Sequence, residues 1–285
     1  MTDSPKYALL NGELILSSAL AISVSNRGFM YGDGCFETFR SYQGKFLHLD
    51  EHFDRLQIGL NYLGMDSLID SETLLKQVNL LLEKNELEDV DTAFRIQCVR
   101  KGGAGFVTTS NKADYVITSR ALPEVKKEIV LKTVETRAIP EASLSRKVKL
   151  TNSINYIKAA QEVTQLGGDD ALMLTVNNMV SETTIANIFW VKGSKIFTPS
   201  TNCDLLPGVT RQIVIQLVSE VADVELIEGE FQLEELISAE AVFCTNSLRE
   251  IFPIARINNT SFDELNPVVK SLQKDFELYK ASKLK

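Results

Sequence analysis

The sequence contains few of the residues that build metal sites and disulfide bonds. Its 285 residues include four cysteines and two histidines. The cysteines are far apart and form no Cys-x-x-Cys pair, so we expect buried free thiols and no Cys/His metal site. His48 and His52 are four residues apart, but Leu-Asp-Glu between them does not reproduce the His-Glu-x-x-His pattern of zinc proteases. We therefore predict that the protein binds no metal.

The sequence also lacks an excess of positive charge and a long apolar run. Lysine and arginine number 30 against 38 acidic residues, a net charge of -8, which argues against a nucleic-acid partner and an anionic membrane surface. No apolar run approaches the roughly 20 residues of a membrane span, and residues 1–12 show no secretory signal pattern. We therefore expect a cytoplasmic globular protein.

The first 120 residues alternate between strand and helix patterns. Asn11-Gly12 lies between two short apolar runs and predicts a β-hairpin. Apolar residues at helical spacing predict two helices, the second with Asp70 or Ser71 as its N-cap. The mixture predicts an α+β unit. The expected helices cover 49–63 and 71–87, the strands 7–10, 13–16, 21–24, 35–42, 92–99 and 115–118, a glycine-rich turn 26–34, and a flexible loop 102–105.

A change in composition divides the chain. Pro123 ends a strand pattern and charged residues follow it, so 121–125 is the expected interdomain linker. This gives an N-terminal α/β domain over 1–120 and a C-terminal domain over 126–285. In the second domain we expect strands at 128–136, 171–176, 188–191, 196–198 and 241–245, and helices at 154–163, 211–221 and within 263–284.

The stretch 146–152, RKVKLTN, places Lys149 between apolar Val148 and Leu150 and just before a predicted helix. A lysine at the mouth of a strand can project into a cleft, where desolvation lowers its pKa. The neutral amine can then condense with an aldehyde. The alternative is one of several solvated lysines on a basic strand edge, and spacing alone favours this alternative.

The stretch 35–42 mixes apolar and polar residues without simple strand alternation. Phe36 and Phe39 are interspersed with Glu37, Thr38 and Arg40. One interpretation is a twisted strand with glycines at a bulge. The other is a strand whose polar side chains line a pocket.

Six segments together resemble the class IV aminotransferases, the fold-type IV pyridoxal 5'-phosphate (PLP) enzymes. That family includes branched-chain aminotransferases, D-amino-acid aminotransferases and 4-amino-4-deoxychorismate lyases. No single segment is specific, but all six occur in the family's order along the whole chain. The segments are RGFMYGDGCFETFR (27–40), HFDRL (52–56), KLTN (149–152), SETTIANIFW (181–190), PGVTR (207–211) and FCTNSLREIFPI (243–254).

The resemblance implies a fold and a cofactor site. The fold would be α/β (α+β) with two domains, an N-terminal α/β sandwich and a C-terminal pseudo-barrel, in a homodimer. Lys149 would bind PLP covalently and move the substrate proton, and Glu182 would keep the pyridine nitrogen protonated. The cofactor phosphate would be bound by Arg55, by the helix-start N–H groups of Val209 and Thr210, and by Ser247.

Each of these residues has a plainer interpretation when taken alone. Glu182 would be a surface acid that follows a strand, and residues 208–211 would be an ordinary helix start. Arg55 would be a helix residue paired with Glu51 or Asp54. These alternatives lose weight because the six segments occur together.

Local features favour one reaction within the family. Thr38 stands where branched-chain aminotransferases usually have Gly and where the lyases usually have Thr, whose hydroxyl can relay a proton. The residues after Lys149 lack the tyrosine that the branched-chain enzymes place shortly downstream. Residues 100–106 lack the Arg-x-His clasp of the D-amino-acid enzymes. Residues 245–247 and 186–190 resemble the lyases.

The leading hypothesis is therefore 4-amino-4-deoxychorismate lyase, which forms 4-aminobenzoate and pyruvate on the way to folate. Lys149 and Thr38 would be catalytic, and Arg40, Arg95 or Arg249 would bind a substrate carboxylate. The alternative is a transaminase that uses branched-chain or other hydrophobic amino acids with 2-oxoglutarate. A third hypothesis is a PLP-binding protein without turnover, against which the intact Lys149 and Glu182 argue.

Overall fold

The structure is a computed structural model that describes residues 6–67, 69–122, 126–220 and 224–284. It divides the chain into two compact units. Unit 1 comprises 1–123, 148–152 and 283–285, and unit 2 comprises 124–147 and 153–282. The segment that carries Lys149 therefore belongs to unit 1, although it follows residues 124–147 of unit 2. The predicted linker lies partly outside the described residues, at 123–125.

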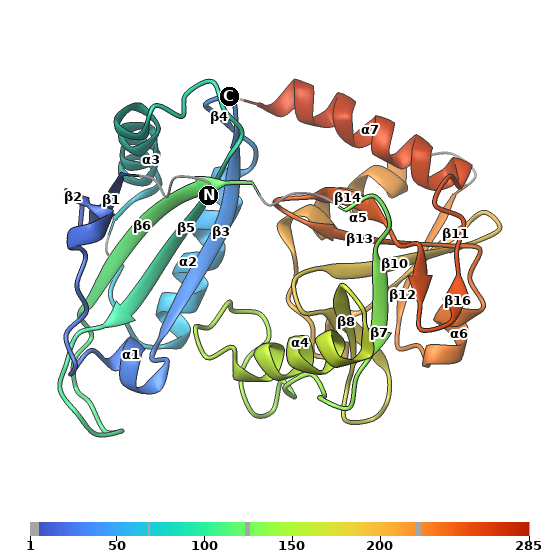
Figure 1. The fold of residues 1–285 in the computed structure, drawn as a ribbon, viewed down its shortest axis with the longest axis horizontal. Helices are drawn as coiled ribbons and strands as arrows, with labels where there is room; N and C mark the ends of the chain where they lie inside the picture. Colours follow the sequence, from blue (N-terminus) through green and yellow to red (C-terminus); the bar gives the residue numbers. More distant parts are fainter. Residues whose placement is uncertain (1–5, 68, 123–125, 221–223, 285) are drawn as a thin grey trace. The chain divides into compact units, whose positions relative to one another are not determined.

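Unit 1 contains a six-stranded antiparallel sheet in the order β2-β1-β6-β5-β3-β4 (Figure 1). Asn11 (φ 51°) and Gly12 (φ 86°) form the predicted hairpin turn between β1 and β2, because such turns need positive φ at both positions. The long strands β3, β5 and β6 lie side by side in the middle of the sheet. The strands are β1 (Tyr7–Leu10), β2 (Glu13–Leu16), β3 (Gly34–Tyr42), β4 (Lys45–Phe46), β5 (Thr92–Arg100) and β6 (Ala113–Ala121).

Two helices pack against the sheet of unit 1, α2 (Leu49–Tyr62) and α3 (Ser71–Asn85). α2 contacts β3, and α3 contacts β1 and β6. Both helices were predicted, and Asp70 is the N-cap of α3, accepting a hydrogen bond from the Thr73 N–H at 2.7 Å. Buried leucines of both helices and alternate residues of β3, β5 and β6 form one apolar core. Successive side chains of a strand point to opposite faces. The alternate side chains of each central strand, on the face away from this core, are therefore available for a site.

Two predictions for unit 1 are wrong. Residues 21–24 form no strand: Ile22 and Val24 are 61% and 86% exposed, and the described strands leave them no pairing partner. The glycine-rich turn 26–34 contains a short helix, α1 (Arg27–Tyr31), because the Asn26 side chain accepts a hydrogen bond from the Phe29 N–H. A single 3-10 turn covers Ser17–Ala19.

Unit 2 contains two five-stranded sheets, in the orders β12-β11-β10-β13-β14 and β16-β15-β7-β8-β9. One cluster of buried apolar side chains joins both sheets, which is the arrangement expected for a pseudo-barrel. The strands are β7 (Val130–Thr133), β8 (Asp170–Leu174), β9 (Val180–Thr183), β10 (Asn187–Lys192), β11 (Lys195–Pro199), β12 (Glu225–Gly229), β13 (Ala241–Asn246), β14 (Glu250–Pro253), β15 (Arg256–Ile257) and β16 (Thr260–Ser261).

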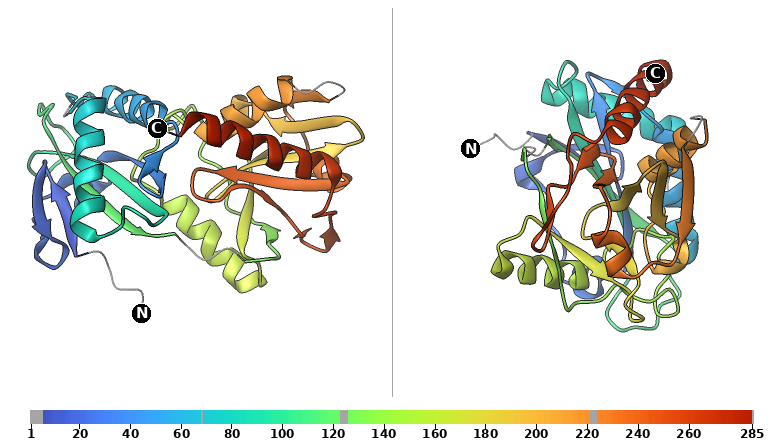
Figure 2. Two further views of the ribbon diagram at one scale, coloured as in Figure 1. Left: turned by 90° about the horizontal axis from the view of Figure 1, so that it is seen from above. Right: turned by 90° about the vertical axis from the view of Figure 1, so that its right-hand side faces the viewer.

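Helices lie against the sheets of unit 2. α4 (Ile154–Leu166) packs on β7 and β8, α5 (Val209–Glu220) packs on β12 and β13, and α7 (Pro267–Lys283) lies beside β14 (Figure 2). A short helix, α6 (Leu233–Ile237), and a 3-10 turn, Thr201–Cys203, complete the unit. The predicted helix 154–163 is confirmed, and Gly167 (φ 69°) ends it. The predicted helix 211–221 is confirmed as far as Glu220, because residue 221 lies outside the described residues.

The sequence missed several short strands of unit 2, including β9, β12 and β14. These strands have four or five residues each, and some carry charged side chains, so they show no apolar run. Among the helices that the structure describes, none combines the length and apolar character needed to cross a membrane.

Candidate active site

Lys149 is attached to the edge of β3. Cys35 and Leu150 form an antiparallel bridge. The Phe36 N–H donates to the Lys149 carbonyl at 2.9 Å, and the Thr151 N–H donates to the Gly34 carbonyl at 2.9 Å. This register sets Lys149 opposite Phe36, so both side chains point to the same face. The Lys149 Nζ lies 4.9 Å from the centre of the Phe36 ring.

Thr38 and Arg95 share this face with Lys149. Thr38 of β3 is directly opposite Arg95 of β5, and Phe36 is directly opposite Gln97. The Arg95 guanidinium lies 3.6 Å from the centre of the Phe36 ring. The structure therefore brings a lysine amine, a hydroxyl and a guanidinium to one face of the sheet, around a single phenylalanine. The interpretation of residues 35–42 as a strand whose polar side chains line a pocket stays a prediction.

The opposite face of β3 carries a buried charge cluster. Glu37 is 1% exposed and accepts hydrogen bonds from Arg55 Nε at 2.6 Å and Arg55 Nη2 at 2.9 Å. His52 Nδ1 lies 2.9 Å from Glu37 Oε2. Arg55 is thus a paired helix residue, but its partner is Glu37 rather than Glu51 or Asp54. A guanidinium has five N–H bonds, and this pairing uses two.

The charge states in this cluster follow from burial and pairing. Burial alone would raise the pKa of Glu37, but Arg55 outweighs it and holds that pKa far below the usual range. Burial lowers the pKa of His52 more than its hydrogen bond to Glu37 raises it, and the charges of Arg55 and Lys149 lower it further. Glu37 is therefore anionic and His52 neutral at pH 7, so Arg55 is fixed in orientation by a single negative charge.

In unit 2, Glu182 is a buried acid within β9 and not a surface acid that follows a strand. Its Oε1 accepts hydrogen bonds from Arg146 Nη2 at 3.1 Å and the Tyr156 hydroxyl at 2.8 Å. Its Oε2 accepts from Asn187 Nδ2 at 3.2 Å and the Leu206 N–H at 3.1 Å. Donation of hydrogen bonds by these four groups favours the ionised form of the carboxyl group.

The start of α5 is tied to Glu182 through Asn187. Asn187 Nδ2 also donates to the Leu206 carbonyl at 2.8 Å. A Cβ on Gly208 would lie 2.3 Å from Asn187 Oδ1, so only glycine fits there. Val209 and Thr210 are the first residues of α5, where backbone N–H groups have no acceptor within the helix. This is the geometry that suits an anion.

The remaining predicted site residues, Ser247, Arg249 and Arg40, lie in different parts of the structure. Ser247 lies in the turn between β13 and β14, where Asn246 Oδ1 accepts from the Arg249 N–H at 2.8 Å. The Arg249 guanidinium lies 5.7 Å from the centre of the Phe252 ring. Arg40 forms an ion pair with Asp91. Of the three arginines predicted to bind a carboxylate, Arg95 is the one grouped with Lys149 and Thr38.

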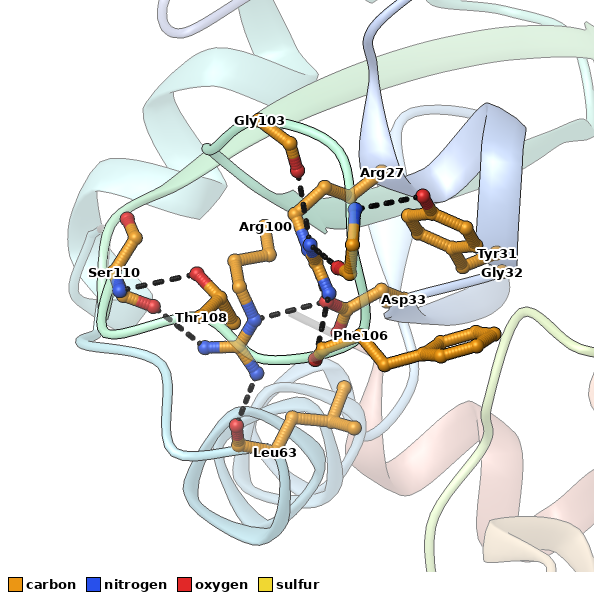
Figure 3. Close-up of polar contacts among 12 residues, drawn as sticks. Arg27, Tyr31, Gly32, Asp33, Leu63, Arg100, Gly103, Phe106, Thr108 and Ser110 are labelled. Atoms are coloured by element: carbon orange, nitrogen blue, oxygen red, sulfur yellow. Dashed lines mark hydrogen bonds and ion pairs between the residues drawn. The ribbon is translucent and has the colours of Figure 1, made fainter.

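A second charge cluster fixes the loop after β5 (Figure 3). Asp33 Oδ2 accepts from Arg27 Nε at 2.8 Å and from Arg100 Nε at 3.0 Å. Arg27 Nη1 also donates to the carbonyls of Gly103 at 3.0 Å and Gly105 at 2.6 Å. The loop that the sequence predicts as flexible is therefore anchored to α1.

Sequence reasoning missed the side chains that hold the predicted ones. Arg146 and Tyr156 contact Glu182, whereas Glu37 contacts Arg55 and Gln97 contacts Arg95. A signal existed only for Arg146, because it belongs to the same stretch as Lys149. Tyr156 and Glu37 are distant in sequence from their partners. Gln97 lies two residues from Arg95 on the same strand, β5, a spacing that puts both side chains on one face but does not by itself indicate a contact.

Comparisons with known proteins point to one family. The chain is 31% identical over 261 residues to an aminodeoxychorismate lyase of Bacillus subtilis, covering 89% of this chain and 87% of that protein. It is 31% identical over 277 residues to a putative branched-chain-amino-acid aminotransferase of Methanocaldococcus jannaschii, covering 93% and 94%. Among solved structures, a branched-chain aminotransferase of Thermoproteus uzoniensis has a TM-score of 0.90 at 24% identity, covering 97% and 95%. The family model for amino-transferase class IV matches residues 34–257, and this chain belongs to that family.

Proposed function

We propose that this protein is a 4-amino-4-deoxychorismate lyase, which converts aminodeoxychorismate to 4-aminobenzoate and pyruvate. Class IV aminotransferases are PLP-dependent enzymes, so the chemistry is that of a PLP-dependent lyase or aminotransferase. The observation that carries the choice is the placement of Thr38 opposite Arg95 on the face that holds Lys149. It supplies a base, a proton relay and a carboxylate-binding cation together.

The residues of this chain suit PLP. Lys149 offers the amine, and the buried Glu182 carboxylate offers an acceptor for the pyridine N–H. Arg55, the N–H groups of Val209 and Thr210, and Ser247 would bind the phosphate. When bound, PLP supplies an electron sink that stabilises the negative charge left by removal of a proton.

The protein's own groups then carry the proton and orient the substrate. The Lys149 amine removes the proton from the ring carbon that bears the amino group. The ring becomes aromatic as the C–O bond to the enolpyruvyl group breaks. That fragment leaves with the bonding electrons and takes up one proton, delivered through the Thr38 hydroxyl or from Lys149, to become pyruvate. Atoms and charge balance without another reactant, and Arg95 binds a carboxylate throughout.

A side-by-side assay of the purified, PLP-loaded protein tests this proposal. One arm supplies aminodeoxychorismate generated in situ and follows 4-aminobenzoate and pyruvate. The other supplies L-leucine or D-alanine with 2-oxoglutarate. Equal amounts of 4-aminobenzoate and pyruvate would support the lyase, and amino transfer without 4-aminobenzoate would refute it.

The second candidate is a transaminase that uses branched-chain or other hydrophobic amino acids with 2-oxoglutarate. It is favoured by the identity to the putative branched-chain aminotransferase, which extends over nearly the whole length of both chains. The two candidates share Lys149, Glu182 and the phosphate-binding residues. They differ in the need for the Thr38 hydroxyl.

We also propose that the lyase serves folate biosynthesis in the cytoplasm and acts as a homodimer. The anchored loop after β5 supports a partner surface, because it presents Phe106 and Val107 at 88% and 92% exposure on a backbone held by Arg27. Rigid exposed apolar side chains are typical of interaction sites. Light scattering after size exclusion should give a dimer mass, and Phe106→Ser should reduce it. A monomeric wild-type protein would exclude the homodimer.

A further inference from the structure

We propose that Gln97 is a specificity-determining residue that positions Arg95 while leaving its positive charge available to a carboxylate group of the substrate. This inference rests on the proposed function, in which Arg95 faces the substrate. In this proposal Gln97 does not itself donate a hydrogen bond to the substrate. It determines instead whether the site prefers an anionic or a neutral ligand.

The Arg95 guanidinium is held on two sides. Its Nε and Nη2 both donate to Gln97 Oε1, at 3.0 and 2.8 Å. Its plane lies against the Phe36 ring, at 3.6 Å from the ring centre. An amide oxygen and an aromatic face fix the orientation of a guanidinium, but neither carries a negative charge that would neutralise it.

The neighbours of Arg95 leave this charge without compensation. By strand register, Thr38 of β3 and Thr118 of β6 stand on either side of it, and neither is charged. Burial lowers the pKa of Arg95, and the nearby positive charge of Arg120 lowers it further. Within the described residues, no carboxylate forms an ion pair with Arg95. A half-buried cation without a counter-ion costs stability, and such an arrangement is typical of a functional site.

Other arginines near β3 differ from Arg95 because they form ion pairs with carboxylates. Arg40 pairs with Asp91, Arg55 pairs with Glu37, and Arg100 shares Asp33 with Arg27. Each of these has a carboxylate partner in the protein. Arg95 instead has the amide of Gln97, which is the same size and shape as glutamate but neutral. The difference at position 97 is therefore one of charge and not of space.

The position of Arg95 also fits a small acidic ligand. The Lys149 Nζ lies 4.9 Å from the centre of the same Phe36 ring. The amine and the guanidinium are therefore no farther apart than the sum of their two distances to that ring. A single small acid that contains one ring is therefore long enough to place its carboxylate on Arg95 and its other end at the Lys149 amine. The expected ligand class is a small carboxylic acid.

The test changes only the charge at position 97. Gln97→Glu keeps the side-chain shape and gives Arg95 an internal counter-ion. Its KM should rise about tenfold or more while kcat changes little, because the lost interaction is made equally in the ground state and the transition state. Gln161→Glu, at an exposed glutamine on α4, adds the same charge elsewhere and should change neither constant.

Calorimetry on the PLP-loaded protein gives a readout that needs no turnover. The probes are benzoate and its neutral isostere benzamide. The wild type should prefer benzoate, Gln97→Ala should reduce the preference partly, and Gln97→Glu should abolish it. A purely structural role for Gln97 predicts the reverse order for the two variants, since alanine disturbs packing more than glutamate does.

The outcomes separate this inference from the lyase proposal. A preference for benzoate that disappears in Gln97→Glu supports the inference even if the lyase assay fails. A preference that Gln97→Glu retains, or no preference in the wild type, overturns it. Should Gln97→Glu not fold by circular dichroism, Gln97→Ala and Arg95→Gln decide together. Partial loss in the first and complete loss in the second are expected, and no loss in either refutes the inference.

Discussion

The substitution Glu37→Gln should destabilise unit 1 strongly while changing almost no volume. Glu37 is buried and accepts two hydrogen bonds from Arg55 and lies against His52. An amide cannot supply both acceptors or the charge, so Arg55 is left as a buried cation without its counter-ion. Breaking a buried pair in this way costs about 3–5 kcal/mol. That cost should lower the thermal midpoint by roughly 6–15 °C.

The measurement is thermal unfolding followed by far-ultraviolet circular dichroism at pH 7. Glu72→Gln is the matched control, because Glu72 pairs with Lys76 at 2.6 Å on the surface of α3, where such pairs contribute little. The double variant Glu37→Gln/Arg55→Met removes the stranded cation and should be more stable than Glu37→Gln alone. If the double variant is instead less stable by the sum of both single losses, the account of an uncompensated charge is refuted.

Four further predictions follow from the site and its supports. Lys149→Ala should lose both activity and the visible absorbance of bound PLP while its circular dichroism stays native, and an active variant would exclude Lys149 as the attachment point. Thr38→Val removes only the hydroxyl, so it should slow 4-aminobenzoate formation about 100-fold and any amino transfer far less; equal losses would remove Thr38 from the proton relay. Asp33→Asn should speed hydrogen exchange in the loop 101–112, measured by mass spectrometry, since two arginines lose their shared carboxylate. Because His52 has a lowered pKa in the folded protein, unfolding takes up a proton below the ordinary histidine pKa, so stability should fall as pH drops from 7 to 5 and His52→Gln should flatten that slope.

The elements that periodicity marks strongly were predictable from the sequence. The helices α2 and α3 have apolar residues at helical spacing, and leucines of both helices are buried in the core of unit 1. The Asn11-Gly12 turn needs positive φ at both residues, which few other pairs supply. By contrast, residues 21–24 have strand composition but remain exposed, because strand formation requires a neighbouring strand that composition does not reveal.

In the candidate site, the sequence could indicate only the residues to which the family resemblance assigns a chemical role. Lys149 and Glu182 stood out through resemblance, whereas their surroundings depend on contacts between distant segments. Lys149 pairs with β3 across more than a hundred residues, and Glu182 is enclosed by Arg146 and Tyr156 from segments that precede it. No local sequence pattern predicts such long-range contacts. The sequence could therefore indicate Glu182 without indicating which side chains contact it.

The chain uses three different partners for arginine, and the partner indicates the task. Arg55 is held by the carboxylate of Glu37, which fixes its direction and gives it a counter-ion within the protein. Arg146 donates to Glu182 together with a hydroxyl, an amide and a backbone N–H, so the acid and not the arginine is the group that is oriented. Arg95 is held by a neutral amide, which fixes its direction and preserves its charge. An arginine that is oriented but not neutralised is prepared for an anion from outside the protein, and this distinguishes Arg95 from Arg27 and Arg100, which share the carboxylate of Asp33.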